Sequence, residues 1–134
     1  RDIFAPVAAH LSLGRPPGVF GEPLDSLTIL PLPLPQRVGR ILVGQVLHTD
    51  TFGNLITNIR ENDLSGGEIT LKIKDKLISG LSRTYTEGEG LIALIGSSGY
   101  LEISVREGNA SVLLGAGVGD PVRVKLNDKK FYQF

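Results

Sequence analysis

Short apolar runs separated by glycines and polar residues fill most of the chain after residue 38. In one run, Ile69, Leu71 and Ile73 alternate with polar residues, and this period of two is typical of a strand buried on one face. We predict that the other runs are strands too, spanning residues 41–48, 54–59, 77–81, 91–95, 100–105 and 122–126. About seven short strands predict a mainly β fold, a small barrel or sandwich.

The first 38 residues have a different pattern. Apolar residues recur at helical spacing between Ile3 and Leu13 and are followed by Gly14, so we predict a short amphipathic helix. Six of the eight prolines then lie in residues 15–35, and such a segment donates few backbone hydrogen bonds and favours an extended conformation. The sequence therefore predicts a helix within residues 1–14, a linker over 15–38 and a β domain over 39–134.

The composition excludes several classes of function. Lys plus Arg and Asp plus Glu number 14 each, so no net charge attracts nucleic acid or an anionic membrane. The chain has no cysteine and only two histidines, so we expect neither a disulfide framework nor a metal site. No apolar run approaches the ~20 residues that span a bilayer, and we expect a soluble, cytoplasmic protein.

Two polar corners between apolar runs are the candidate binding features. The first is Asp50-Thr51-Phe52-Gly53-Asn54, and the second is Gly96-Ser97-Ser98-Gly99. Glycines let the backbone approach another group closely, so the amides and hydroxyls of both corners can point at one polar ligand. We expect the corners to meet at one rim of the barrel and to form a pocket. Turn formation is the structural alternative for Asp50, Asn54 and both serines.

A structural role is also the alternative to ligand binding for three other candidate residues and for one loop. Phe52 and Tyr85 can cover a flat ligand ring, or they can pack within the core and a loop. Glu102 lies in an alternating strand, where a solvated carboxylate is usual. Residues 115–120 are rich in glycine but lack the preceding strand and following helix of a phosphate-binding loop, so we predict an ordinary loop.

Three ordered segments carry a resemblance to a known family. They are residues 1–9 (RDIFAPVAA), 50–59 (DTFGNLITNI) and 96–103 (GSSGYLEI), with Gly119-Asp120 downstream. Together they resemble the C-terminal part of the S-adenosyl-L-methionine (SAM) hydrolase (adenosine-forming) family. That family is related to the SAM-dependent fluorinase and chlorinase, which cleave the same molecule with halide. The resemblance covers nearly the whole chain.

The resemblance implies a larger protein with a defined reaction. A preceding α/β domain, truncated here, would end in the helix of residues 1–14, and the β-barrel would follow the linker. SAM would lie between the N-terminal domain of one subunit and the C-terminal domain of its neighbour in a homotrimer. Water would attack the ribose C5′ and give adenosine and L-methionine, without a metal or further cofactor. The water-activating residues would belong to the N-terminal domain, so we expect no catalytic residue in this chain and no activity from it alone.

The resemblance also implies roles for individual residues. Asp50 would bind the polar amino-acid end of the ligand, Asn54 the nucleoside, and Ser97 either part. Glu102 would accept a hydrogen bond from the ligand, and the backbone at Val105 would meet the adenine edge. Phe52, Tyr85 and Ser98 complete the set. The predicted substrate-binding residues are thus Asp50, Phe52, Asn54, Tyr85, Ser97, Ser98, Glu102 and Val105.

Two other functions remain alternatives. Ser98 stands where the fluorinase-type enzymes carry an arginine, which favours water over halide, but the nucleophile pocket lies outside this sequence and a SAM-dependent halogenase is one alternative. The other is a noncatalytic β-barrel interaction module that binds a protein or single-stranded RNA. Zero net charge and few aromatic residues disfavour RNA, because such grooves combine basic side chains with stacking platforms.

Overall fold

The computed structural model describes residues 2–64, 68–87 and 90–127, and the chain divides into two units, Arg1–Leu32 and Pro33–Phe134. In the first unit, helix α1 (Phe4–Ser12) confirms the predicted helix, and the 3-10 helix η1 (Pro17–Val19) follows it. No residue of α1 is buried. Within the described part of the chain, no helix is both long enough and apolar enough to cross a membrane.

The second unit is built mainly of strands. Those found in the described residues are β1 (Gln36–Val38), β2 (Ile41–Thr49), β3 (Leu55–Arg60), β4 (Ile69–Ile73), β5 (Lys76–Ser79), β6 (Leu91–Ile95), β7 (Tyr100–Val105) and β8 (Pro121–Leu126). The 3-10 helix η2 (Glu61–Leu64) follows β3, and helix α2 (Ala110–Leu114) precedes β8. Every strand predicted from the sequence is present, with small differences at the ends.

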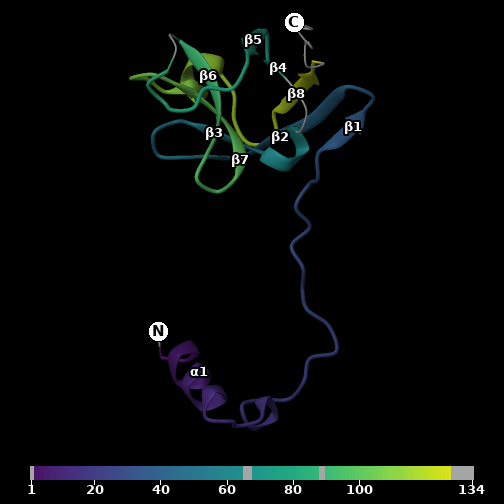
Figure 1. The fold of residues 1–134 in the computed structure, drawn as a ribbon, viewed down its shortest axis with the longest axis vertical. Helices are drawn as coiled ribbons and strands as arrows, with labels where there is room; N and C mark the ends of the chain where they lie inside the picture. The colour runs from purple at the N-terminus through teal and green to yellow at the C-terminus, as the bar shows by residue number, and fades with distance from the viewer. Residues whose placement is uncertain (1, 65–67, 88–89, 128–134) are drawn as a thin grey trace, which may run out of the picture. The chain divides into compact units, whose positions relative to one another are not determined.

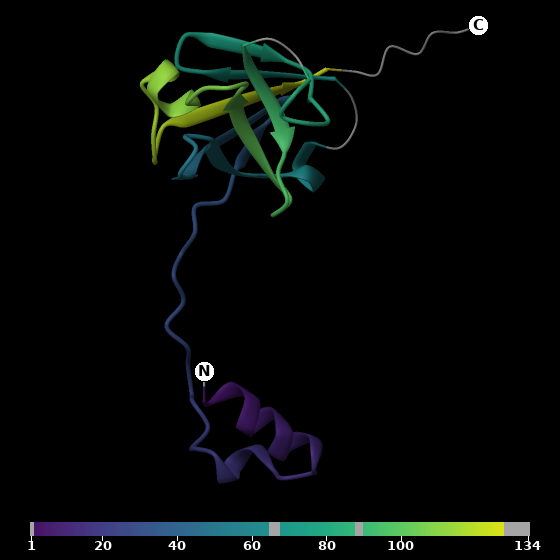
Figure 2. The ribbon, with the colours of Figure 1, turned by 90° about the vertical axis from the view of Figure 1, so that its left-hand side faces the viewer.

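The strands form a nearly closed antiparallel barrel, as the sequence predicts (Figure 1). Their order is β5-β4-β8-β2-β3-β7-β6, and β1 pairs with β2 outside this path. The two ends of the order approach each other where Ser82, just after β5, forms a parallel bridge with Leu94 of β6. The amide of Ser82 also donates to the carbonyl of Ala93 at 2.8 Å. Figure 2 shows the same strands from the side, curling around one interior.

Alternate residues of the strands fill the interior. In β8, Val122 and Val124 are fully buried, whereas Arg123 and Lys125 between them are exposed. The same period of two places one face of each strand inward, because successive side chains of a strand point to opposite faces. The largest fully buried apolar side chains are Val46, Leu55, Ile59, Leu71, Ile73, Leu101, Ile103, Val122 and Val124.

Strand β1 lies within the range that the sequence predicts to be linker. Its residue Gln36 pairs with Val43 of β2. Just before β1, the carbonyl of Pro33 accepts a 2.8 Å hydrogen bond from the side chain of Asn58, whose oxygen in turn accepts from the amide of Gln45. The end of the proline-rich segment is therefore attached to the barrel by groups that lie elsewhere in the sequence, which local composition does not reveal.

Candidate functional site

The turn between β2 and β3 is closed by the side chain of Asp50. One carboxylate oxygen accepts from the backbone amides of Phe52 at 2.9 Å and Asn54 at 2.8 Å. The other oxygen accepts from the side-chain amide of Asn54 at 2.8 Å. Gly53 completes the turn with a φ of 86°, in the left-handed region that favours glycine. The turn explanation for Asp50 is thus correct, and the same carboxylate also orients Asn54.

Asn54 joins this turn to strand β7. Its side-chain oxygen accepts a 2.6 Å hydrogen bond from the hydroxyl of Ser104, which is buried. The pairing of β3 with β7 brings Asn54 next to Ser104, because Leu55, the residue after Asn54, pairs with Ile103, the residue before Ser104. Partial burial raises the pKa of Asp50, but the hydrogen bonds from the Asn54, Phe52 and Gly53 groups outweigh it and hold that pKa below its usual value. The site therefore contains an ionised carboxylate next to a fixed amide.

Tyr85 and Glu102 form a second polar pair. The Tyr85 hydroxyl donates to a carboxylate oxygen of Glu102 at 2.9 Å. Glu102 is only 7% exposed, so the solvated carboxylate that the alternation predicts is not found. Its carboxyl group also lies against Gly96, where any Cβ atom would overlap it. Burial, followed by the hydrogen bond and negative charge of Glu102, raises the pKa of Tyr85.

These groups surround a pocket of about 600 Å³. This volume falls in the range of small-molecule sites, roughly 300–1,000 Å³. Two aromatic residues of its lining are exposed, Phe52 at 76% and Tyr85 at 45%. The lining residues are Asp50, Phe52, Asn54, Tyr85, Thr86, Ser104, Val105, Arg106, Glu107 and Gly108. We call this the first pocket.

The two serines of the second corner do not line the first pocket. Ser97 and Ser98 are exposed in the turn that precedes β7, whereas Asn54 lies beside Ser104 near the other end of that strand. The expectation that both corners meet at one rim is therefore wrong. The reason is the antiparallel pairing of β3 with β7, which places residue 54 opposite the end of β7 and not its beginning. Ser98 instead lines a different pocket.

The structure thus unites most of the predicted residues. Asp50, Phe52, Asn54, Tyr85 and Val105 line the first pocket, and Glu102 is attached to it through Tyr85.

Sequence reasoning missed several lining residues, of which Ser104 is the most informative. Ser104 lies two positions after Glu102, so the period of two in β7 already places both on the same face. That signal was sufficient to find it. Thr86, Arg106, Glu107 and Gly108 lie in loops, where no periodic signal exists.

Helix α2 supports the β2–β3 turn. Asn109 caps the helix by accepting from the amide of Val112 at 2.8 Å. Gly115 ends the helix with a left-handed φ of 56°. The amide of Ser111 donates to the carbonyl of Gly53 at 3.0 Å, so the helix and the turn are held together.

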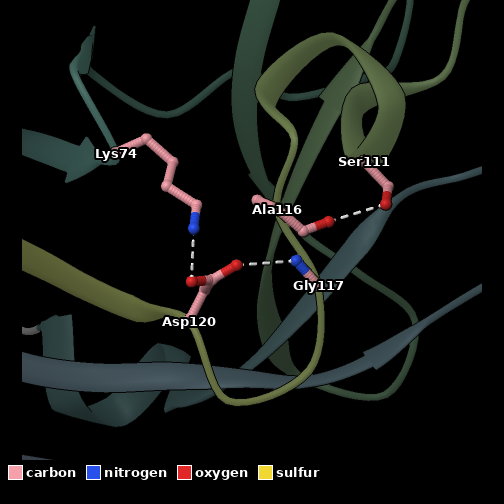
Figure 3. Close-up of polar contacts among 5 residues, drawn as sticks. All are labelled: Lys74, Ser111, Ala116, Gly117 and Asp120. Carbon is pink, nitrogen blue, oxygen red and sulfur yellow. Dashed lines mark hydrogen bonds and ion pairs between the residues drawn. The ribbon is translucent and has the colours of Figure 1, made fainter.

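The glycine-rich loop after α2 is occupied by its own hydrogen bonds. Asp120 accepts from the Lys74 ammonium group and from the amide of Gly117, and the Ser111 hydroxyl donates to the carbonyl of Ala116 (Figure 3). The amide of Gly119 donates to the backbone carbonyl of Val46. The hydrogen bond from Lys74, followed by that from Gly117, lowers the pKa of Asp120. With these amides committed, the loop does not form a phosphate cradle, in agreement with the sequence prediction.

No metal centre is evident in residues 2–64, 68–87 and 90–127, where no group of three or more His, Asp or Glu side chains could hold an ion. The residues that line the first pocket supply the carboxylates of Asp50 and Glu107, the amide of Asn54, the hydroxyls of Thr86 and Ser104, the guanidinium group of Arg106 and two aromatic rings.

Comparison with known families decides the assignment. Residues 44–123 match the family described as the SAM hydroxide adenosyltransferase C-terminal domain. The chain belongs to this family. The matched segment contains all the predicted site residues and both corners, and it ends within β8.

Curated relatives of this SAM hydroxide adenosyltransferase domain are named (R)-S-adenosyl-L-methionine hydrolase. One from Thermus thermophilus is 39% identical over 128 residues, which cover 92% of this chain and 47% of the relative. Another, from Salinispora tropica, is 33% identical and is covered over 49% of its length. The chain thus spans about half the length of these relatives and corresponds to their C-terminal part.

Solved structures share the fold of this family member. A crystal structure of an uncharacterized conserved protein from Thermotoga maritima gives a TM-score of 0.71 at 32% identity and covers 93% of this chain and 51% of its own. A conserved hypothetical protein from Thermus thermophilus gives a TM-score of 0.66 at 38% identity, with coverage of 92% and 51%. In both comparisons the likeness again extends over about half of the solved chain.

Proposed function

We propose that this chain is the nucleoside-binding part of a SAM hydrolase that uses water to attack the ribose C5′ of SAM and releases adenosine and L-methionine. The family and the names of the curated relatives support the reaction. The observation that carries the binding role is the first pocket, where the hydrogen-bonded side chains of Asn54 and Ser104 share the lining with Phe52 and Tyr85.

The first pocket suits the parts of adenosine. Adenine offers two π faces and an edge with donors and acceptors, and aromatic side chains with nearby polar groups recognise such a ring. Phe52 and Tyr85 would cover the faces, and the backbone at Val105 would meet the edge. Asn54 would bind the nucleoside through its amide. Because Asp50 stays ionised near neutral pH, it would also favour the cationic groups of SAM.

The rest of the ligand would extend along β7. Glu102 lies between the first pocket and the turn of Ser97 and Ser98, and it would accept a hydrogen bond from the ligand. The two serines would then contact the amino-acid end. Their distance from Asn54 fits an elongated ligand better than a small one, because β7 rises by about 3.3 Å per residue between the corners.

The reactive half of the site would come from outside this chain. Displacement at C5′ needs a positioned water molecule in a pocket from which bulk water is excluded. We propose that the N-terminal domain of a neighbouring subunit in a cytoplasmic homotrimer supplies the water-activating residues, and that no metal or further cofactor takes part. On this proposal the isolated chain binds the nucleoside but does not turn SAM over.

Calorimetry with adenosine and an assay of adenosine release from SAM test the proposal. We expect the chain to bind adenosine and to release none from SAM. The variant Tyr85→Ala should weaken adenosine binding by about tenfold, since stacking of a base on an aromatic ring contributes ~1–3 kcal/mol. The matched control Tyr100→Ala removes a tyrosine that does not line the first pocket.

Three results would count against the proposal. Binding of a short oligonucleotide in place of adenosine would support the noncatalytic interaction module. Equal affinity for adenosine in wild type and Tyr85→Ala would show that adenosine does not bind in the first pocket. Adenosine release by the purified chain would show that the reactive half is not missing.

A further inference from the structure

Five neighbouring strands, β5, β4, β8, β2 and β1, present one outward face of the barrel, which we call the outer face (Figure 1). Leu42, Leu71 and Val124 of these strands are buried, so the residues on either side of each point outward. The register aligns these outward residues in two rows, which are Leu77-Lys72-Arg123-Val43-Gln36 and Ser79-Thr70-Lys125-Ile41-Val38. We propose that the outer face binds an acidic segment of a partner protein.

Three cations lie at the centre of the outer face. Lys72 of β4 is directly opposite Arg123 of β8, and Lys125 lies two positions further along β8. All three residues are exposed. Opposed side chains of an antiparallel pair lie about 5 Å apart and diagonal ones about 7–8 Å, so these charges repel one another. Like charges in this position destabilise a sheet, and a bound carboxylate removes the repulsion.

The outer face carries no acid that balances these cations. Neither row contains Asp or Glu. Within residues 2–64, 68–87 and 90–127, no ion pair joins Lys72, Arg123 or Lys125 to a carboxylate. Two acids precede these strands, but Asp120 is paired with the ammonium group at the end of β4, and Glu68 forms no ion pair with the three cations. Since the chain as a whole has no net charge, the excess is local to this face.

Exposed apolar side chains lie on both sides of the cations. Leu77 of β5 is opposite Lys72 and is 68% exposed. Ile41 of β2 is opposite Lys125 and is 44% exposed. Neither row contains an aromatic residue, and surfaces for single-stranded nucleic acid combine cations with stacking rings, so the pattern disfavours RNA. A protein segment in which carboxylates alternate with apolar side chains matches it, because apolar contacts and complementary charges combine in protein interfaces.

The outer face is separate from the proposed nucleoside site. None of its three cations lines the first pocket. The inference therefore does not rest on nucleoside binding, and either proposal can fail without the other.

NMR titration of the 134-residue chain with the acetylated peptide LEELEEL tests the proposal. We expect the backbone amides of Lys72, Arg123 and Lys125 to shift, and those of Asn54 and Ser104 at the first pocket to stay unchanged. The matched peptide LQQLQQL keeps the leucines but lacks the charge, and it should not shift the three amides at the same concentration. Binding of LEELEEL should weaken between ~0.1 M and ~1 M salt, because the Debye length falls from about 10 Å to about 3 Å.

The variant Arg123→Glu separates binding from folding. It places a carboxylate opposite Lys72, so an attraction replaces a repulsion and the urea midpoint of unfolding should rise. The same variant should bind LEELEEL at least ~tenfold more weakly, because a negative charge then faces the peptide. Arg83→Glu makes the same charge change at an exposed arginine between β5 and β6, and it should bind the peptide as wild type does.

Each of four results would overturn the inference. One is the absence of shifts at Lys72, Arg123 and Lys125 with LEELEEL, and another is equal binding of LEELEEL by wild type and Arg123→Glu. Shifts of these amides with a short oligonucleotide, but not with LEELEEL, would assign the outer face to nucleic acid. Dimerisation of wild type in sedimentation that Arg123→Glu abolishes would assign it to a second copy of the chain.

Discussion

Asn54 and Ser104 lie 50 positions apart in sequence and are joined by a 2.6 Å hydrogen bond, in which the serine hydroxyl donates to the asparagine oxygen. Ser104 is only 3% exposed, so its hydroxyl has little access to water. The other end of the Asn54 side chain donates to Asp50. This bond therefore fixes which way the amide faces and connects the β2–β3 turn to β7.

Replacing the donor of this pair should destabilise the chain. In Ser104→Ala, the partly buried oxygen of Asn54 loses its partner, and an unsatisfied buried acceptor costs about 1–3 kcal/mol. We expect the midpoint of urea denaturation to fall by a corresponding amount, with an unchanged slope. Adenosine affinity should fall with it, because the amide is no longer held in one orientation.

A serine outside this network provides the control. Ser79 of β5 is exposed, so Ser79→Ala should change the free energy of unfolding by no more than about 0.5 kcal/mol. Equal stability of the two variants would show that the Ser104 hydroxyl contributes nothing to the fold.

Gly53 should be the least replaceable residue of the turn. Its φ of 86° is strained for any other residue, and a Cβ atom there would overlap the side chain of Asn109, which caps α2. The conformation costs about 1–2 kcal/mol and the overlap about 1–3 kcal/mol more. The free energy of unfolding of Gly53→Ala, measured by heat or urea, should therefore be lower than that of wild type by the sum of the two costs.

The matched variant Gly80→Ala separates these two causes. Gly80 has a similar φ of 75°, but no atom lies near the position of its Cβ. It should show the conformational cost alone. If Gly53→Ala and Gly80→Ala lose the same stability, the contact between the turn and Asn109 has no energetic role.

Local patterns predict the fold well because each depends on neighbouring residues. The strands β4 and β8 and the helix α1 are visible in short stretches of sequence, and all three are confirmed. The strand β1 was missed because its stability comes from pairing with β2 and not from its own composition.

The candidate site was less predictable, since its assembly depends on which strands pair. Asn54 meets Ser104 and not Ser97 because β3 runs antiparallel to β7, and nothing in either corner specifies that register. Likewise, the buried Glu102 meets Tyr85, which lies 17 positions away in a loop that the alternation of β7 does not indicate. Composition and alternation identify polar residues as candidates for a binding site, but they do not identify the residue that each of them contacts.

The titration of Tyr85 should respond to Glu102. Burial and the Glu102 carboxylate raise the pKa of Tyr85 above its ordinary value of 10.0, so stability that depends on the neutral phenol is complete below that value and is lost as the pH rises through the higher folded pKa. In Glu102→Gln the negative charge is gone, and the pKa of Tyr85 should fall toward 10.0. Alkaline titration of tyrosinate absorbance measures the change.

Tyr85→Phe identifies which part of the absorbance belongs to this residue, since the chain has three tyrosines. The titration step that shifts in Glu102→Gln should be the one that disappears in Tyr85→Phe. A tyrosine titration that is the same in wild type and Glu102→Gln would show that the 2.9 Å contact does not perturb the phenol.

Asp120 should give the chain part of its acid sensitivity. Its hydrogen bonds from Lys74 and Gly117 hold the pKa of this carboxyl below its ordinary value of 3.8. Since the folded pKa is the lower one, the stabilisation is present above pH 3.8 and is lost as the pH falls through the folded pKa. Asp120→Asn should therefore be less stable than wild type near neutral pH, and the difference should shrink in acid.

The neighbouring ion pair of Asp75 and Lys76 supplies the comparison, because Asp75 is highly exposed and lies 3.4 Å from its partner in the same β4–β5 turn as Lys74. Exposed pairs of this kind contribute little, so Asp75→Asn should match wild type across the pH range. Urea denaturation at a series of pH values measures all three proteins. A stability difference between wild type and Asp120→Asn that does not change with pH would mean that Asp120 acts through the shape of its loop and not through its charge.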